Sequence, residues 1–312
     1  MLSIGIDIGG TNVKIGLVNE NYEIIYKNSV KTLADREPEV IIKNITDLIS
    51  DTLQKNHLKK ADIEHIGIGC PGNVDSNTGI VTEVANINVS DWNLKKEIQE
   101  ASGIETYIAN DGSCAALGEA CTGSTADVSH SVMLTLGTGI GGGIIIDKKL
   151  YVGKNGKAGE FGQMTIKWDD PPARYGRIGS FESYASGTAL INQTKEAIQQ
   201  NPGSILAKTA DNDMTQVNGQ TAFRAMQMNC PIGKKVVDTY IFYLSIGIKN
   251  IIMALRPEVI TLGGGISRQG EILIKLLSRH MTESYDDTQI RLAELSNDAG
   301  IIGAVALKSK LE

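Results

Sequence analysis

Two glycine-rich turns follow apolar runs and contain the residue types that bind phosphate. The first is 7-DIGGTNVK-14 and the second is 137-GTGIGGG-143. Backbone amides in such turns can converge on an anion, because glycine has no Cβ to block a close approach. Neither turn has the Walker A or G-x-G-x-x-G pattern, and each alone is also typical of a plain hairpin. A third cluster, 263-GGG-265, ends another apolar run, and the three together favour a phosphate-binding cleft.

The side chains in these turns suggest a nucleotide with its metal. Asp7 could orient a hydrated Mg²⁺, Lys14 adds positive charge, and the threonines add hydroxyl donors. The third cluster could lie against a base or ribose. The candidate nucleotide-binding residues are therefore Asp7, Gly9, Gly10, Thr11, Lys14, Gly137, Thr138, Gly139, Gly264 and Gly265.

Asp111 is the candidate catalytic base. It ends the apolar run 104-IETYIAND-111 and precedes a helical segment. A carboxylate in this position can accept the proton of an attacking hydroxyl, which is worth roughly 10² to 10⁴ in rate. The alternative is that Asp111 only caps the helix, a role that aspartate fills well. Taken alone, Asp111 is more typical of a helix cap. Together with the surrounding motifs, it is interpreted as the catalytic base.

The elements that must position these residues alternate between strand and helix, which predicts α/β layering. The hairpin 4–18 can be placed over 132–146 with Gly9 on Gly137, which a duplicated fold or two unrelated hairpins would explain. Residues 201–235 are polar and are expected to form a helical or loop insertion. The main predicted strands are 2–8, 12–19, 22–30, 65–72, 104–111 and 258–267, and the main predicted helices are 37–55, 112–120, 236–255 and 299–310.

Length and composition indicate a soluble protein of two domains. A chain of 312 residues exceeds what one core usually supports. The net charge of −6 argues against nucleic acid as a partner. Four scattered cysteines suit free thiols in a reducing cytoplasm. A strand begins at residue 2 and no apolar run approaches the roughly 18 residues of a membrane span, so we expect no signal peptide, no membrane and a cytoplasmic location.

The ordered motifs resemble the ROK group of repressors, reading frames and sugar kinases, within the actin, Hsp70 and hexokinase superfamily. The resemblance covers essentially the whole chain. It implies an α/β, two-domain actin-like ATPase (ribonuclease H-like) fold with a cleft between the domains, here residues 1–111 plus 298–312 and residues 112–297. The motifs that carry it are D-I-G-G-T-N-x-K at 7–14, C-P-G at 70–72, A-N-D at 109–111, L-G-T-G-I-G-G-G at 136–143, G-E-F-G at 159–162 and L-G-G-G-I-S at 262–267.

The resemblance also implies ATP with Mg²⁺ as phosphate donor, a sugar hydroxyl as acceptor, and a homodimer or homotetramer. Asp111 matches the family's catalytic aspartate. An asparagine before a tryptophan also contacts the sugar in the family, and 86-NINVSDW-92 offers two. The candidate sugar contacts are thus Gly72, Asn86 or Asn88, Asn110, Asp111, Glu160, Gln163 and Glu182.

The segment 162–182 departs from the family pattern. Most members have a histidine and three cysteines that bind a structural zinc, and here these positions are Gln163, Ala173, Tyr175 and Ser180. All four ligands are replaced together, which predicts no zinc site and a loop held by packing of Tyr175 and Phe181. The histidine of the family also contacts the sugar. Its replacement by Gln163 therefore leaves the identity of the substrate sugar undetermined.

Glucose is the first choice of substrate, followed by N-acetylmannosamine and then β-glucosides, fructose and allose. The donor could be ATP or polyphosphate. A repressor would need a helix-turn-helix before the first glycine turn, and only six residues precede Asp7 in this sequence. A sugar-sensing pseudokinase is the remaining alternative, which Asp111, Lys14 and both glycine turns oppose.

Overall fold

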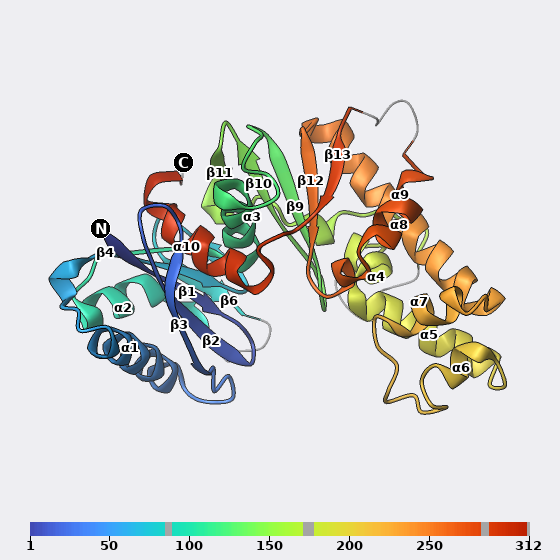
Figure 1. Ribbon diagram of the computed structural model, residues 1–312, viewed down its shortest axis with the longest axis horizontal. Helices are drawn as coiled ribbons and strands as arrows, with labels where there is room; N and C mark the ends of the chain where they lie inside the picture. The colour runs from blue at the N-terminus through green and yellow to red at the C-terminus, as the bar shows by residue number, and fades with distance from the viewer. Residues whose placement is uncertain (85–88, 171–177, 282–286, 311–312) are drawn as a thin grey trace. The chain divides into compact units, whose positions relative to one another are not determined.

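The computed structural model describes residues 1–84, 89–170, 178–281 and 287–310 (Figure 1). Its chain forms two compact units. Unit 1 comprises Met1–Met133, Gly143–Gly159 and Glu294–Glu312, and unit 2 comprises Leu134–Gly142 and Glu160–Ala293.

Unit 1 is built on a five-stranded mixed sheet with the order β3-β2-β1-β4-β8. Strands β1 to β3 pair antiparallel, whereas β4 and β8 extend the sheet in parallel. A small antiparallel sheet of β5, β6 and β7 follows β4 in the chain. The bounds are β1 Leu2–Ile8, β2 Asn12–Val18, β3 Ile24–Lys31, β4 Ile63–Cys70, β5 Asn73–Asp75, β6 Ile80–Glu83, β7 Ser90–Trp92 and β8 Thr106–Asn110.

The alternation of side chains along these strands gives the sheet two different faces. One face presents branched residues such as Ile4, Ile6 and Ile15, which form one core with helices α1 (Pro38–Lys55) and α2 (Leu94–Ser102). Both helices have an apolar stripe at helical spacing, and Pro38 begins α1, where its missing N–H costs nothing.

The other face presents glycines, so that helices can approach it closely. Helix α10 (Ala299–Lys310) lies beside β1, as Figure 1 shows for the red and blue segments. A Cβ at Gly67 would overlap the carbonyl of Ala304. A Cβ at Gly118, on helix α3 (Asp111–Thr122), would likewise overlap the carbonyl of Ala299. The glycines therefore set how closely α10 packs on the sheet and on α3.

This packing places α3 in unit 1, whereas the predicted domains divide the chain between residues 111 and 112. The buried carboxylate of Glu119, on α3, also accepts hydrogen bonds from the backbone N–H groups of Glu294 (3.2 Å) and Leu295 (2.9 Å), where the chain re-enters unit 1. The helix is thus fastened to the C-terminal segment as well as to the sheet. The predicted domain bounds, 1–111 plus 298–312 and 112–297, stay a prediction.

The second five-stranded sheet has the order β11-β10-β9-β12-β13, which repeats the order of the first sheet. Strand β9 corresponds to β1 and β10 to β2, so the glycine turns at 9 and 137 occupy equivalent places. This equivalence supports duplication over two unrelated hairpins. The bounds are β9 Ser131–Leu136, β10 Ile140–Ile146, β11 Lys149–Tyr151, β12 Val259–Gly263 and β13 Gln289–Leu292.

The remaining helices belong to unit 2. The predicted insertion 201–235 contains two short helices, α6 and α7, and also the start of α8, which begins at Pro231 and not at residue 236. Helix α8 is long and apolar enough to span a membrane by length and composition, contrary to our expectation from the sequence. However, 56% of its most apolar window is buried inside the structure, and core helices of soluble proteins pass the same test. The bounds are α4 Phe181–Ala185, α5 Gly187–Gln200, α6 Ile205–Lys208, α7 Thr221–Gln227, α8 Pro231–Leu255 and α9 Glu271–Ser278.

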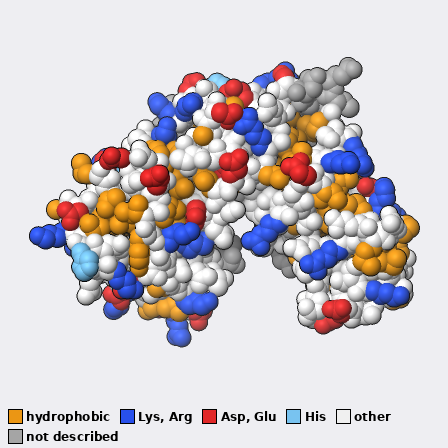
Figure 2. Space-filling model, viewed as in Figure 1, with side chains coloured by type: hydrophobic (Ala, Val, Ile, Leu, Met, Phe, Trp, Pro, Cys, Tyr) orange, Lys and Arg blue, Asp and Glu red, His pale blue; other side chains and the backbone are white. Residues whose placement is uncertain are grey.

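Surface charge and cysteine burial follow the sequence-based expectations in part. On the face in Figure 2, lysine and arginine side chains are interspersed with acidic ones. All four cysteines are free thiols, and Cys70, Cys114 and Cys230 are buried, while Cys121 is partly exposed.

Candidate functional site

In unit 1, Asp111 lies where β8 ends and α3 begins. Asn110 caps the helix, because its Oδ1 accepts from the N–H of Gly112 (2.9 Å) and of Ser113 (3.3 Å). Its Nδ2 donates to the carbonyl of Gly72 at 3.0 Å. The capping role that we considered for Asp111 therefore belongs to Asn110. Oδ1 of Asp111 accepts a hydrogen bond from the same Gly112 N–H at 2.8 Å.

The surroundings of Asp111 raise the pKa of its carboxyl above its ordinary value. Desolvation is the largest cause and the negative charge of Asp7 adds to it, while the Gly112 N–H acts in the opposite direction. The residue itself remains accessible to solvent. Solvent reaches the side chain, but the surrounding protein replaces much of the water that would screen its charge. A raised pKa makes Asp111 a better proton acceptor near neutral pH.

Asp7 is the penultimate residue of β1 and lies on the face of the sheet that carries α10. Its Oδ2 accepts from Nζ of Lys14 at 2.8 Å, so the two candidates of the first glycine turn form a partly buried ion pair. The turn between them is closed by a hydrogen bond from the Gly9 N–H to the carbonyl of Asn12 (3.0 Å). Thr32 supports the turn from β3's end, since its N–H donates to the carbonyl of Thr11 (3.0 Å).

In unit 2, a pocket of about 440 Å³ lies at the second glycine turn. Three of its lining residues, Gly137, Thr138 and Gly265, were predicted to bind nucleotide. The sequence reasoning missed the others. Signals were present for some: Ser186 caps α5 directly before two lining residues, and the N-G pair at 218–219 is a turn signature. The missed lining residues are Leu136, Gly187, Thr188, Ile191, Asn218, Gly219, Gln220, Ile266 and Arg268.

Gly264 has a different environment from Gly265. Its φ is +83°, and an added Cβ would lie 2.7–2.8 Å from backbone atoms of Leu136. Gly264 is not among the described residues that line the pocket. A side chain there would first strain the backbone, so replacing Gly264 is a poor test of nucleotide binding.

Two of the candidate sugar contacts of unit 2, Gln163 and Glu182, meet at the short helix α4. Nε2 of Gln163 donates to Oε1 of Glu182 at 2.7 Å, and the N–H of Ile140 donates to Oε2 at 3.3 Å. Glu160 is exposed just before the 3₁₀ turn Phe161–Gln163. Asn86 and Asn88 lie outside the described residues.

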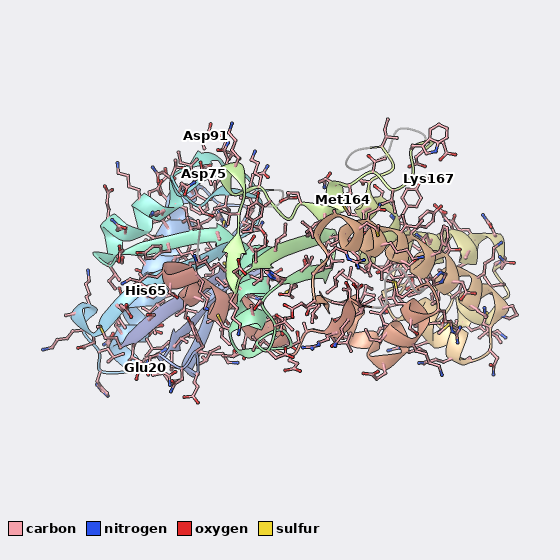
Figure 3. The ribbon with its side chains drawn as sticks, turned by 90° about the horizontal axis from the view of Figure 1, so that it is seen from above. Glu20, His65, Asp75, Asp91, Met164 and Lys167 are labelled. Carbon is pink, nitrogen blue, oxygen red and sulfur yellow. The ribbon has the colours of Figure 1, made fainter. Side chains whose placement is uncertain are left out.

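Packing holds the segment around Glu182. Phe181 is fully buried, and its ring fills a notch at Gly247 of α8, where any Cβ would overlap it. This confirms half of the packing hypothesis for the segment 162–182, since Tyr175 lies outside the described residues. Met164 and Lys167, labelled in Figure 3, lie on either side of the isolated β-bridge between Thr165 and Ser180, and the carbonyl of Met164 accepts from the Phe181 N–H at 2.8 Å.

The described residues contain no group of three or more histidine, cysteine, aspartate or glutamate side chains able to hold a metal. A single carboxylate such as Asp7 still suits Mg²⁺, which usually keeps several waters and takes its other ligands from substrate phosphates.

Comparisons with known proteins agree with these motifs. The sequence profile of the ROK family matches residues 3–310. The glucokinase of Halalkalibacterium halodurans is 34% identical over 307 residues, covering 96% of this chain and 92% of that protein. The xylose repressor of Caldicellulosiruptor bescii is 28% identical over 309 residues, covering 97% of this chain and 77% of that protein.

Among solved structures, a ROK family glucokinase from Streptomyces griseus in complex with glucose and AMPPNP superposes with a TM-score of 0.82. It is 28% identical, with 98% of this chain and 99% of that chain covered. The fold is the α/β, actin-like fold of two domains found in ROK sugar kinases. The chain belongs to the ROK family.

Proposed function

We propose that this protein is an ATP-dependent sugar kinase that phosphorylates a hexose hydroxyl, with glucose as the first candidate substrate. The observation that carries the proposal is Asp111: an accessible carboxylate of raised pKa at the end of β8, in the A-N-D motif and with its neighbour Asn110 fixed as the helix cap. The similarity to glucokinases supports the choice of sugar.

In this mechanism Asp111 accepts the proton of the sugar hydroxyl while that oxygen attacks the γ-phosphorus of ATP. The bond from the γ-phosphorus to the bridging oxygen breaks, and ADP leaves with the electron pair. Glu160, Gln163, Glu182, Asn110 and the carbonyl of Gly72 are the proposed sugar contacts, together with Asn86 or Asn88. Positioning and charge neutralisation supply most of the remaining rate enhancement.

The pocket of unit 2 is the proposed nucleotide site. Its glycine turn offers backbone N–H groups and the hydroxyl of Thr138 to phosphates, and Gly265 leaves open space for the nucleoside. In unit 1, Asp7 would hold Mg²⁺ through water, and Lys14 keeps that carboxylate oriented. The metal, when bound, would neutralise phosphate charge.

An ADP-release assay with a panel of hexoses and amino sugars tests the proposal. Turnover should be highest with glucose, and a higher kcat/KM with N-acetylmannosamine, a β-glucoside, fructose or allose would reassign the substrate. Replacing ATP by polyphosphate tests the donor. The similarity to a xylose repressor favours one alternative, a sugar-binding protein without chemistry. Sugar binding by calorimetry, with no ADP released from ATP in the presence of any of these sugars, would support that alternative.

A further inference from the structure

The second glycine turn is held from outside at both of its ends. At the first end, the N–H of Gly187, which opens α5, donates to the carbonyl of Gly137 at 2.7 Å. At the other end, the N–H of Ile140 donates to Oε2 of Glu182 at 3.3 Å. Within the turn itself, the N–H of Gly137 donates to the carbonyl of Gly139 at 3.0 Å. The turn's shape therefore depends on residues 182 and 187.

Close packing enforces the contact between the Glu182 carboxylate and the turn. A Cβ at Gly139 would lie 2.5 Å from Oε2 of Glu182. A Cβ at Gly162 would overlap the carbonyl of Ile140 and would lie 3.2 Å from the same Oε2. Two glycines thus make room for the carboxylate, one on the turn and one on the segment that carries Gln163.

The carboxylate is itself fixed in place. Gln163 donates to its other oxygen at 2.7 Å. The residues flanking Glu182 anchor α4 to α8, because Phe181 fills the notch at Gly247 and the ring of Tyr184 packs against that of Tyr243 with centroids 4.5 Å apart. With Gln163 on one carboxylate oxygen and α4 anchored to α8, the other oxygen of Glu182 is in a fixed position to hold the turn.

We propose that Glu182 is a positioning residue for the nucleotide, because its carboxylate fixes the glycine turn in the conformation that receives the phosphates. This inference rests on the proposed function, and it adds a second role to the sugar contact assigned to the same residue. A sugar contact alone would leave nucleotide affinity unchanged when no sugar is present. The positioning role requires that affinity to change.

The experiment compares Glu182→Ala and Glu182→Gln with the wild-type protein in the absence of sugar. The glutamine amide can accept from the Ile140 N–H through its oxygen and can pair with Gln163, whereas alanine can do neither. Glu196→Ala, which removes an exposed glutamate from α5, is the matched control. Affinity for AMPPNP is measured by calorimetry, and hydrogen–deuterium exchange is followed on peptides that contain Ile140.

We expect Glu182→Ala to weaken AMPPNP binding roughly tenfold or more, as the loss of a hydrogen bond to a charged group allows, and to speed exchange in the turn. Glu182→Gln should stay within about threefold of the wild-type affinity, and Glu196→Ala should match the wild type. Wild-type affinity and exchange in Glu182→Ala would overturn the inference, and so would equal losses in both Glu182 variants. Failure of the wild-type protein to bind AMPPNP would instead overturn the proposed function, and the exchange data would still decide whether Glu182 holds the turn.

Discussion

Gly264 and Gly265 are adjacent, yet their replacement should have opposite consequences. Gly264 has φ +83° and no room for a Cβ beside the backbone of Leu136. Gly265 has φ −64°, no heavy atom within 4 Å of an added Cβ, and a place in the wall of the pocket. We therefore predict that a side chain at 264 damages stability, whereas one at 265 blocks the nucleotide.

The magnitudes follow from these geometries. For Gly264→Ala, the positive φ costs about 1–2 kcal/mol. The overlap with Leu136 adds about 1–3 kcal/mol, so the variant should lose about 2–5 kcal/mol and its Tm should fall by roughly 5–15 °C. For Gly265→Leu, stability should change by about 0.5 kcal/mol at most. Its side chain should fill part of the pocket and raise the Kd for AMPPNP about tenfold or more.

Thermal unfolding and calorimetric titration with AMPPNP measure both effects. Gly203→Leu is the matched control, because Gly203 is exposed and also has open space around its Cβ. This control should leave Tm and affinity unchanged. Wild-type affinity in a folded Gly265→Leu variant would refute the assignment of the pocket to the nucleotide. An unchanged Tm in Gly264→Ala would refute the steric argument.

Three further outcomes are expected. Asp111→Asn should abolish phosphoryl transfer and leave sugar affinity in calorimetry largely intact, because an amide keeps the shape but accepts no proton; near-normal turnover would remove Asp111 from the catalytic role. Stability should fall as the pH drops below about 6.5, because burial lowers the pKa of His65 (Figure 3) and the unfolded chain then binds the proton more readily than the folded one. Urea titrations between about pH 5 and pH 8 should show this loss, and a variant His65→Gln with the same pH dependence would exclude His65 as its source. Elemental analysis should find no stoichiometric zinc after dialysis, and a Tm that falls on chelation, with one zinc per chain, would show that the segment 162–182 binds metal after all.

The sequence predicted the main sheet of unit 1 and its helices α1, α3 and α10, because their periodicity and glycine punctuation are local properties, but it missed helix α2 and the short strands β5, β6 and β7. Strand β1 matches the predicted range, and helix α1 was predicted from residue 37 and begins at Pro38. The predicted helix at 112–120 became α3, which starts at Asp111 and ends at Thr122. The repeat of 4–18 at 132–146 is reflected in two sheets of the same strand order.

The site was less predictable where it depends on contacts distant in sequence. Nothing local distinguishes Gly264 from Gly265, since the positive φ and the closeness of Leu136 arise only when β12 reaches its place. Likewise, no sequence motif predicts that the Ile140 N–H donates a hydrogen bond to Glu182, which is 42 residues away. The capping choice between Asn110 and Asp111 also required side-chain geometry, because both residue types cap helices well.

The docking of α10 on the glycine face of unit 1 has a consequence for folding during synthesis. The ribosome makes β1, β4 and α3 first, and α10 only after all of unit 2. At about 5–20 residues per second, the nascent sheet waits on the order of ten seconds or more for that helix. Meanwhile the surface around Gly5, Gly67 and Gly118 has no covering segment. We therefore expect the first half of the chain to stay incompletely packed until α10 is made, and a ribosome stalled within unit 2 should display it in a protease-sensitive state.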